Sequence, residues 1–165
     1  MSSVITLGLS QIKVGDASTA GTMPGELTKI GKTYKDSCQI SQDASDVTEH
    51  FEEGHAAPEV RKKTKKMPII KFSLMDCDVD ALVQYIGGTK DVSTQAWNFD
   101  GSSINSNKAI RIETEQGLDF DIPNADIEAV INAQLTSSGI FLVDFTVTPM
   151  AVDNGKAIVA TPKGE

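Results

Sequence analysis

The sequence predicts a mainly β fold: an antiparallel β-sandwich or partly closed barrel with one flanking α-helix and a long projecting hairpin. Three observations lead to this fold class. Residues 125–135 alternate between aliphatic and polar side chains with period two, which is the repeat of a strand. Residues 78–86 carry the one good helical spacing of apolar side chains. Elsewhere, turn signals rich in Gly, Pro and Asn separate short runs, as in antiparallel sheets.

Length and composition favour a single domain over residues 1–165. Hydrophobic residues make up 39% of the chain and aromatic residues 5%, so the core should be mostly aliphatic. The net charge of −8 argues against a nonspecific nucleic-acid coat, because binding phosphates needs clustered positive charge. No stretch approaches the ~18 apolar residues that span a membrane, and the N-terminus lacks the basic region of a secretory signal. We therefore expect no membrane partner.

The first half of the chain reads as strands joined by polar loops. A strand is expected at 3–9, followed by a loop at 10–32 that contains a Pro-Gly turn signal. Residues 33–42 alternate loosely and fit a second strand. A polar hairpin at 43–66, turning at 54–58, should project from the body because it carries few apolar residues.

A convincing strand at 69–74 precedes the helix at 78–86. Asp78 is a plausible N-cap, and Gly87-Gly88 supplies the stop. The helix is expected to bury one apolar stripe on the sheet, formed by Val79, Leu82, Val83 and Ile86.

The second half reads as strands throughout. Residues 109–122 form a hairpin, and Pro123-Asn124 should then break the chain. The alternating strand at 125–135 should pair with 140–148, and a short strand is expected near 157–160.

Acidic and histidine clusters are better explained by structure than by metal binding. The spacing of Asp76, Asp78 and Asp80 resembles the start of a calcium loop, but Ala81 and Gly87 stand where such a loop needs Gly and Glu. Helix capping accounts for these aspartates.

His50 and His55 lie near several glutamates, but they are five residues apart and flank a turn. The sequence therefore predicts no metal and no cofactor.

Catalytic chemistry is not expected either. The chain contains no nucleophile-elbow, Walker or dinucleotide-binding pattern. The pairs Asp119/Asp121 and Asp126/Glu128 should lie on exposed faces of strands. Cys38 and Cys77 match no metal spacing, so two free buried thiols are expected, with a disulfide as the alternative.

The hairpin at 43–66 has one acidic arm and one basic arm. Such a hairpin is marginal alone in water and suits docking on a neighbour of the same kind, acid against base. An ordinary solvated hairpin is the alternative. The residues expected to make this inter-subunit contact are Asp46, Glu49, Phe51, Glu52, Glu53, Arg61, Lys62, Lys63, Lys65 and Lys66.

Three segments together resemble phage major tail tube proteins of Bacteroides-type prophages. They are the TEHFEEG hairpin, the helix ending in GG-T, and the hairpin that runs from IPNA to FLVDFTVTP. The resemblance covers roughly residues 31–150. It is a pattern of segments and contains no catalytic signature.

This resemblance implies a β-sandwich or small barrel with a helix, six copies to a ring, and rings stacked into a hollow tube for DNA. It implies a homo-oligomer that contacts other tail proteins and meets DNA only in passing. The protein would belong to the virion tail, and to the host cytoplasm before assembly. Contractile injection and type VI-like secretion tubes share this architecture and remain an alternative. A secreted β-sandwich that binds a small ligand or glycan is the second alternative.

The polar face of the strand at 125–135 is the expected lining of such a lumen. An acidic wall would repel phosphate and keep DNA mobile. The residues predicted to face the lumen are Asp126, Glu128, Asn132 and Gln134.

Overall fold

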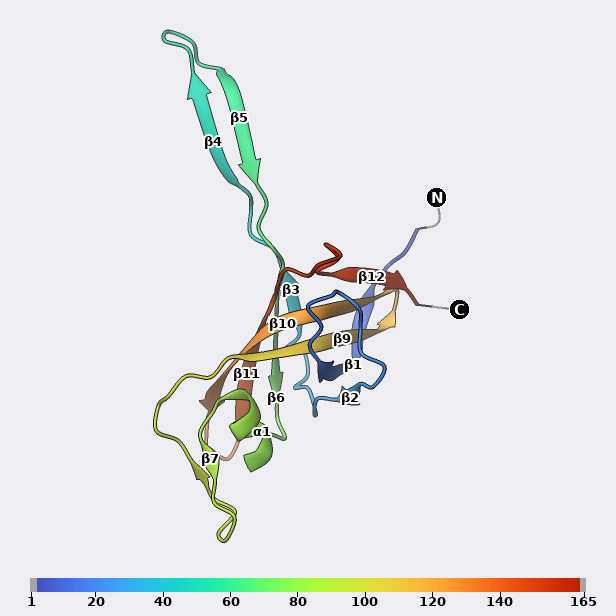
Figure 1. Ribbon diagram of the computed structural model, residues 1–165, viewed down its shortest axis with the longest axis vertical. Coiled ribbons are helices and arrows are strands. Elements are labelled where there is room, and N and C mark those ends of the chain that lie inside the picture. The colour runs from blue at the N-terminus through green and yellow to red at the C-terminus, as the bar shows by residue number, and fades with distance from the viewer. Residues whose placement is uncertain (1–2, 164–165) are drawn as a thin grey trace.

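The computed structural model, which describes residues 3–163, confirms a mainly β, antiparallel fold with one helix in that range (Figure 1). Eight strands form the main sheet, in the order β2-β1-β9-β10-β11-β6-β3, and β12 adds to β10 beside β11. These strands are β1 (Leu7–Asp16), β2 (Thr28–Lys29), β3 (Gln39–Ser41), β6 (Ile69–Leu74), β9 (Ser106–Gln116), β10 (Leu118–Ala133), β11 (Phe141–Pro149) and β12 (Val159–Pro162).

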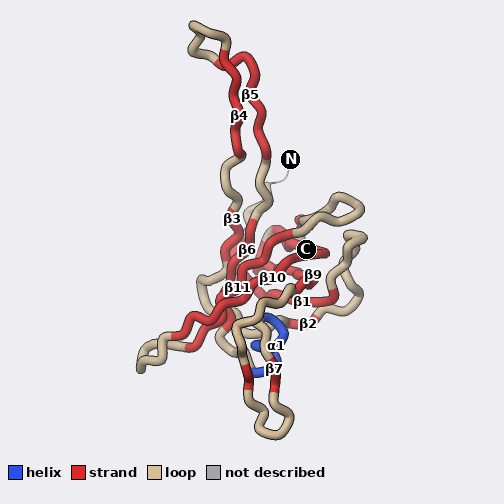
Figure 2. The backbone as a smooth tube through the Cα atoms, turned by 60° about the vertical axis from the view of Figure 1, so that its left-hand side comes forward, coloured by secondary structure: helices blue, strands red, loops and turns tan. Residues whose placement is uncertain are grey.

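Two small sheets lie outside the main one. Strands β4 (Asp46–Phe51) and β5 (Pro58–Thr64) form a hairpin that stands away from the body along the long axis of the molecule (Figures 1 and 2). Strands β7 (Thr89–Lys90) and β8 (Trp97–Asn98) form a short hairpin after the helix. The hairpin predicted at 43–66 is therefore present, with its turn at 52–57, slightly earlier than the expected 54–58.

The main sheet is curled but not closed into a barrel. Strands β2 and β3 are its two ends. A single hydrophobic cluster nevertheless contains Ile12 from β1 and Leu74 from β6, near opposite ends of the sheet. The sheet must therefore bend around one shared core, because a flat sheet would hold these side chains apart.

Aromatic contacts occupy the middle of this core. The rings of Phe72 and Phe145 stack with centroids 5.1 Å apart, and Tyr85 meets Phe145 edge-on at 5.1 Å. Burial raises the pKa of Tyr85 to about 12, so its hydroxyl stays neutral. The remaining fully buried side chains are mostly aliphatic, as the composition predicts.

The helix α1 (Val79–Tyr85) is confirmed, but none of the four residues of the predicted apolar stripe is fully buried. The Asp78 carboxylate accepts from the Ala81 N–H at 2.9 Å, which confirms the N-cap. Tyr85 is the residue that α1 buries, and Leu82 and Ile86 pack only half-buried against the core. The buried face of the helix is therefore centred on Tyr85, whose ring packs against the ring of Phe145.

The N-terminal strand is longer and later than predicted. It begins at Leu7 and runs to Asp16, so the expected loop at 10–32 is strand at its start and again at β2. A register shift lies between Leu9 and Gln11, and Ile12 is completely buried after it. This bulge shifts the alternation of buried and exposed side chains by one residue. A search for strict period-two alternation therefore misses the strand. The strand expected at 33–42 is reduced to β3.

The break expected at Pro123-Asn124 is wrong. Strand β10 runs through both residues as one 16-residue strand. The pairing with β9 shifts register between Ile122 and Ala125, which is a β-bulge. Proline lacks a backbone donor and is tolerated at such a bulge.

Candidate assembly surfaces

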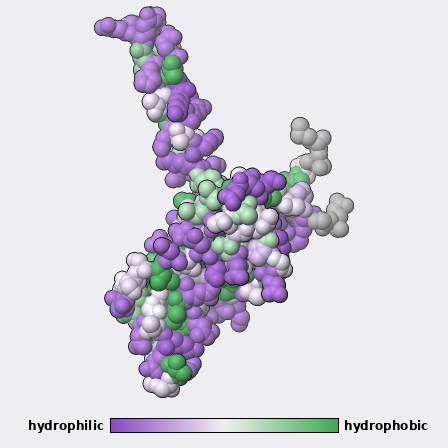
Figure 3. Space-filling view, viewed as in Figure 1, coloured by the Kyte–Doolittle hydropathy of each residue, from purple (hydrophilic) through white to green (hydrophobic). Residues whose placement is uncertain are grey.

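Every residue of strands β4 and β5 is exposed to solvent. Apolar side chains on them include Phe51, which is 54% exposed, and Val60, which is 57% exposed. Figure 3 shows this hairpin as an almost continuous hydrophilic surface broken by a few hydrophobic residues. A two-stranded hairpin with no buried face is only marginally stable by itself, so its apolar side chains suit contact with a partner.

The two arms of this hairpin carry opposite charge. Its acidic arm, residues 43–53, holds five carboxylates, and its basic arm, residues 61–66, holds five cations. Arg61 donates to the Glu49 carboxylate at 2.9 Å, and Lys66 lies 3.2 Å from Asp46. The remaining basic side chains of this arm make no ion pair with any residue in the range 3–163. These side chains are Lys62, Lys63 and Lys65.

All ten residues predicted for the inter-subunit contact lie on this hairpin and are exposed. Three of them lie in β4, three lie in β5, and the others lie in the turn or just after β5. Among residues 3–163, no further strand pairs with either outer edge of the hairpin. Unpaired edges of this kind readily accept another strand.

Three of the four residues predicted to face a lumen, Asp126, Glu128 and Asn132, share one face of β10, and Gln134 follows directly after the end of the strand. Asp126 is half-buried, whereas Glu128, Asn132 and Gln134 are exposed. The amide of Asn132 donates to Asp144 on the neighbouring strand at 3.0 Å. The polar character of this face is confirmed, and its role as a channel wall stays a prediction.

Elsewhere the carboxylates on this face are neutralised. The Arg111 guanidinium donates two hydrogen bonds to the Asp121 carboxylate, at 2.7 and 3.2 Å. The Lys13 ammonium lies 2.9 Å from the Glu113 carboxylate. These two contacts hold the pKa of Glu113 below its usual value and raise that of Arg111. Asp119 accepts from the Thr114 backbone N–H at 2.9 Å. The pair Asp119/Asp121 is therefore half-buried and bonded, and not freely solvated as predicted.

A groove of about 500 Å³ lies between the polar end of β10 and the segment that joins β8 to β9. Trp97 and Phe99 form one wall, with their rings stacked 5.2 Å apart. The Trp97 indole N–H donates to the Gly87 carbonyl at 2.7 Å. This approach depends on Gly88, which has φ of 89° and no room for a Cβ beside Asn98.

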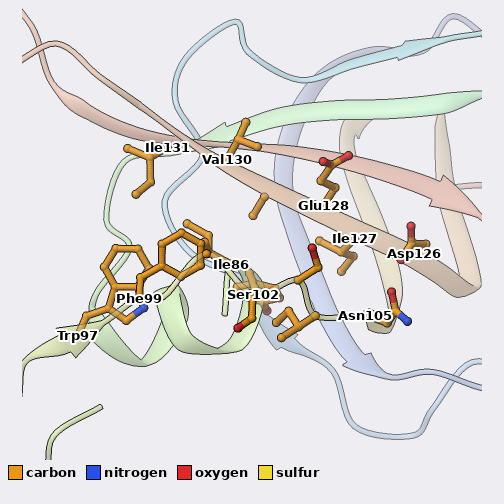
Figure 4. A pocket seen from close by; sticks show the side chains of 15 residues that line it. Ile86, Trp97, Phe99, Ser102, Asn105, Asp126, Ile127, Glu128, Val130 and Ile131 are labelled. Carbon is orange, nitrogen blue, oxygen red and sulfur yellow. The ribbon is translucent and has the colours of Figure 1, made fainter. Parts of the chain in front are cut away.

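Figure 4 shows that the groove has two different ends. Trp97 and Phe99 lie with Ile131 toward one end, and Glu128 and Asp126 lie toward the other. Sequence reasoning missed this site, because its two walls are some thirty residues apart in the chain. The only local signal was the alternation of Trp97 and Phe99 around one polar residue.

The residues weighed for metal binding do not come together. His55 lies 3.6 Å from Glu52 in the exposed turn, and Asp80 pairs with Lys90 at 2.9 Å. Within residues 3–163, no group of three or more His, Cys, Asp or Glu side chains is placed to hold a metal ion.

Cys38 and Cys77 are free thiols, half-buried rather than fully buried as predicted. Burial, followed by the charges of Asp76 and Asp78, raises the pKa of Cys77 to about 11. Burial also raises the pKa of Cys38, so both thiols are poor nucleophiles at neutral pH.

No protein-family model matches this chain, and no curated protein matches it either. No helix within residues 3–163 has the length and apolar character needed to cross a membrane.

Proposed function

We propose that this protein is a structural subunit of a phage tail tube that self-assembles into stacked hexameric rings around a lumen for DNA. The hairpin β4–β5 is the observation that carries this proposal. It is exposed on every residue, carries opposite charges on its two arms, and stands clear of the body (Figure 1). The resemblance of three sequence segments to tail tube proteins supports the same conclusion.

Assembly through this hairpin follows from its charges and its edges. The basic arm of the hairpin on one copy is attracted to carboxylates on the next copy, whereas two identical arms repel. Contacts of this kind join different surfaces of the two copies, so they repeat and close into a ring or grow into a filament. In this proposed role the protein acts in the virion tail, contacts other tail proteins, and carries out no catalytic step.

The polar face of β10 is the proposed lining of the channel. Asp126 and Asn132 lie on this face, and Asp144 adds a further carboxylate from β11. A wall with carboxylates and amides attracts no phosphate and lets DNA slide. Gln134→Lys, just beyond the end of β10 and outside the groove that Asp126 lines, would then leave rings intact and retain DNA, which co-sedimentation of assembled tubes with a DNA fragment would measure.

Electron microscopy of the purified protein at high concentration tests the assembly proposal. We expect rings or tubes for the intact chain, and none after deletion of residues 49–63. Reversing Arg61, Lys62 and Lys63 to Glu should weaken assembly, and raised salt should do so in part because it screens exposed charges. A deletion variant that still forms rings would contradict the role of the hairpin.

A tube from a contractile injection or type VI-like secretion machine is built from the same parts and is the closest alternative. A secreted ligand-binding module is the second candidate, and the stacked pair Trp97 and Phe99 beside a groove favours it. A module of that kind would remain monomeric at every concentration, so the same microscopy separates it from a tube.

A further inference from the structure

The strand β10 has a free edge beside the groove. Its neighbour β9 begins at Ser106, which pairs with Ile127, so β10 continues beyond the end of β9. On its other side β10 stays paired with β11 as far as Ala133. Residues 128–133 of β10 therefore have a strand on one side only.

The hydrogen-bond pattern shows which backbone groups point to this free edge. The Met150 N–H donates to the Asn124 carbonyl, and the Gln134 N–H donates to the Ile140 carbonyl. In an antiparallel pair such bonds recur at every second residue, so the even-numbered residues of β10 bond to β11. The odd-numbered residues Ala129, Ile131 and Ala133 must direct their N–H and C=O groups to the opposite side. No strand within residues 3–163 pairs with them there.

The side chains along this edge would select the occupant. Val130 is 52% exposed and Ile131 is 44% exposed, and both line the groove together with Phe99. Glu128 lies in the same groove, toward its polar end (Figure 4). A suitable occupant is therefore an extended strand that carries an apolar residue close to positive charges.

The chain itself contains such a strand. Strand β5 places Val60 two residues before Lys62 and three before Lys63, and these two lysines have no ion-pair partner within residues 3–163. Its outer edge is also unpaired. The other arm of the hairpin is unsuitable, because β4 would bring Glu49 toward Glu128, and like charges at an interface are unfavourable.

We propose that the free edge of β10 and the groove beside it receive strand β5 from a second copy of this chain. This inference rests on the proposed function and names the receiving surface for the hairpin. The contact must be between copies, because the hairpin and the groove lie toward opposite ends of the molecule (Figure 1). Backbone pairing supplies affinity, and the groove side chains supply selectivity. Glu128 and Asp126, at the polar end of the groove, then lie beside the neighbouring hairpin, and Asn132 and Gln134 remain as the residues of this face that could line the channel.

Two reciprocal variants test the site. Ile131→Glu places a charge in the groove, and Lys62→Glu combined with Lys63→Glu reverses the incoming strand. Each should raise the dissociation constant for self-association at least about tenfold, measured by sedimentation velocity, because a desolvated unpaired charge is costly at an interface. The matched controls are Leu135→Glu, at an 84% exposed apolar residue outside the groove, and the pair Lys29→Glu with Lys156→Glu. These controls should assemble as the intact chain does.

Mixing separates a docking defect from a folding defect. The groove variant keeps its hairpin, and the hairpin variant keeps its groove, so an equimolar mixture should form a one-to-one complex although each variant alone stays monomeric. A photoreactive benzoylphenylalanine at position 99 should cross-link to residues 58–64 of another copy. The same probe at position 135 should not.

Two results would overturn the proposal in distinguishable ways. A chain that stays monomeric without any substitution removes both the tube function and the docking site. A chain that assembles normally with Ile131→Glu, and whose cross-links from position 99 fall outside the hairpin, removes the docking site alone.

Discussion

The body and the hairpin of this protein are both antiparallel β structure, yet they are stabilised in different ways. In β11, every second residue from Val143 to Pro149 is buried, whereas no residue of β4 or β5 is buried. The body is held by burial of apolar side chains, and the hairpin by backbone pairing and exposed ion pairs. The same secondary structure can therefore form a packed core or an exposed arm with no buried face.

The largest difference should come from truncating one aromatic ring in each region. Phe145→Ala removes a ring that contacts both Phe72 and Tyr85, and should lower the free energy of unfolding by ~3–5 kcal/mol. Phe51→Ala in the hairpin should change it by no more than about 0.5 kcal/mol. Urea unfolding at low protein concentration measures both. Equal losses would mean that the hairpin belongs to the cooperative unit.

Substitutions in α1 measure the contribution of a half-buried contact to stability. Leu82 packs half-buried against the core, so Leu82→Ala should cost ~1–2 kcal/mol, less than a fully buried leucine. Tyr85→Ala should cost more, because Tyr85 is the residue that α1 buries. Thermal unfolding of the two variants would give the order. The reverse order would restore the apolar stripe predicted from the sequence.

The cap of the same helix gives a smaller effect. Asp78→Ala removes the acceptor of the Ala81 N–H and should cost ~1 kcal/mol. Asp80→Ala removes an exposed ion pair with Lys90 and a carboxylate from the first turn of the helix, and should cost less than about 1 kcal/mol. Chemical unfolding of both variants beside the intact chain provides the measurement. A larger loss for Asp80→Ala would show that the ion pair and not the cap holds the helix.

The smallest expected effect is a loss of stability at acidic pH, when the Glu113 carboxylate in the body becomes protonated. Lys13 and Gln11 hydrogen-bond to this carboxylate and hold its pKa below the usual value near 4.5. A carboxyl whose pKa is lower in the folded state stabilises fully above the unfolded pKa, and that contribution is lost as the pH falls through the folded pKa. The free energy of unfolding should therefore decline below about pH 4.5.

Glu113→Gln should make that decline shallower, as measured by unfolding across this pH range. An unchanged slope in the Glu113 variant would assign the acid sensitivity to other carboxylates.

Local patterns predicted most elements of the fold. The strand at 69–74, the helix cap at Asp78 and the long alternation after Ala125 all agree with the structure. The errors fall at bulges, near Leu9 and at Pro123-Asn124, where one extra residue shifts the alternation. A bulge is stabilised by the neighbouring strand, so a window of sequence that lacks that neighbour cannot reveal it.

By itself, the sequence determined the mainly β class, the single helix and the polar, oppositely charged hairpin, because these depend on the order of side chains along a short segment. The tertiary structure alone decided which face of the helix is buried, and it brought Trp97 and Phe99 opposite the free edge of β10. That edge exists because β9 begins opposite Ile127 whereas β10 continues to Ala133, which is a relation between two strands. Such relations are set by packing across the sheet, and no local pattern encodes them.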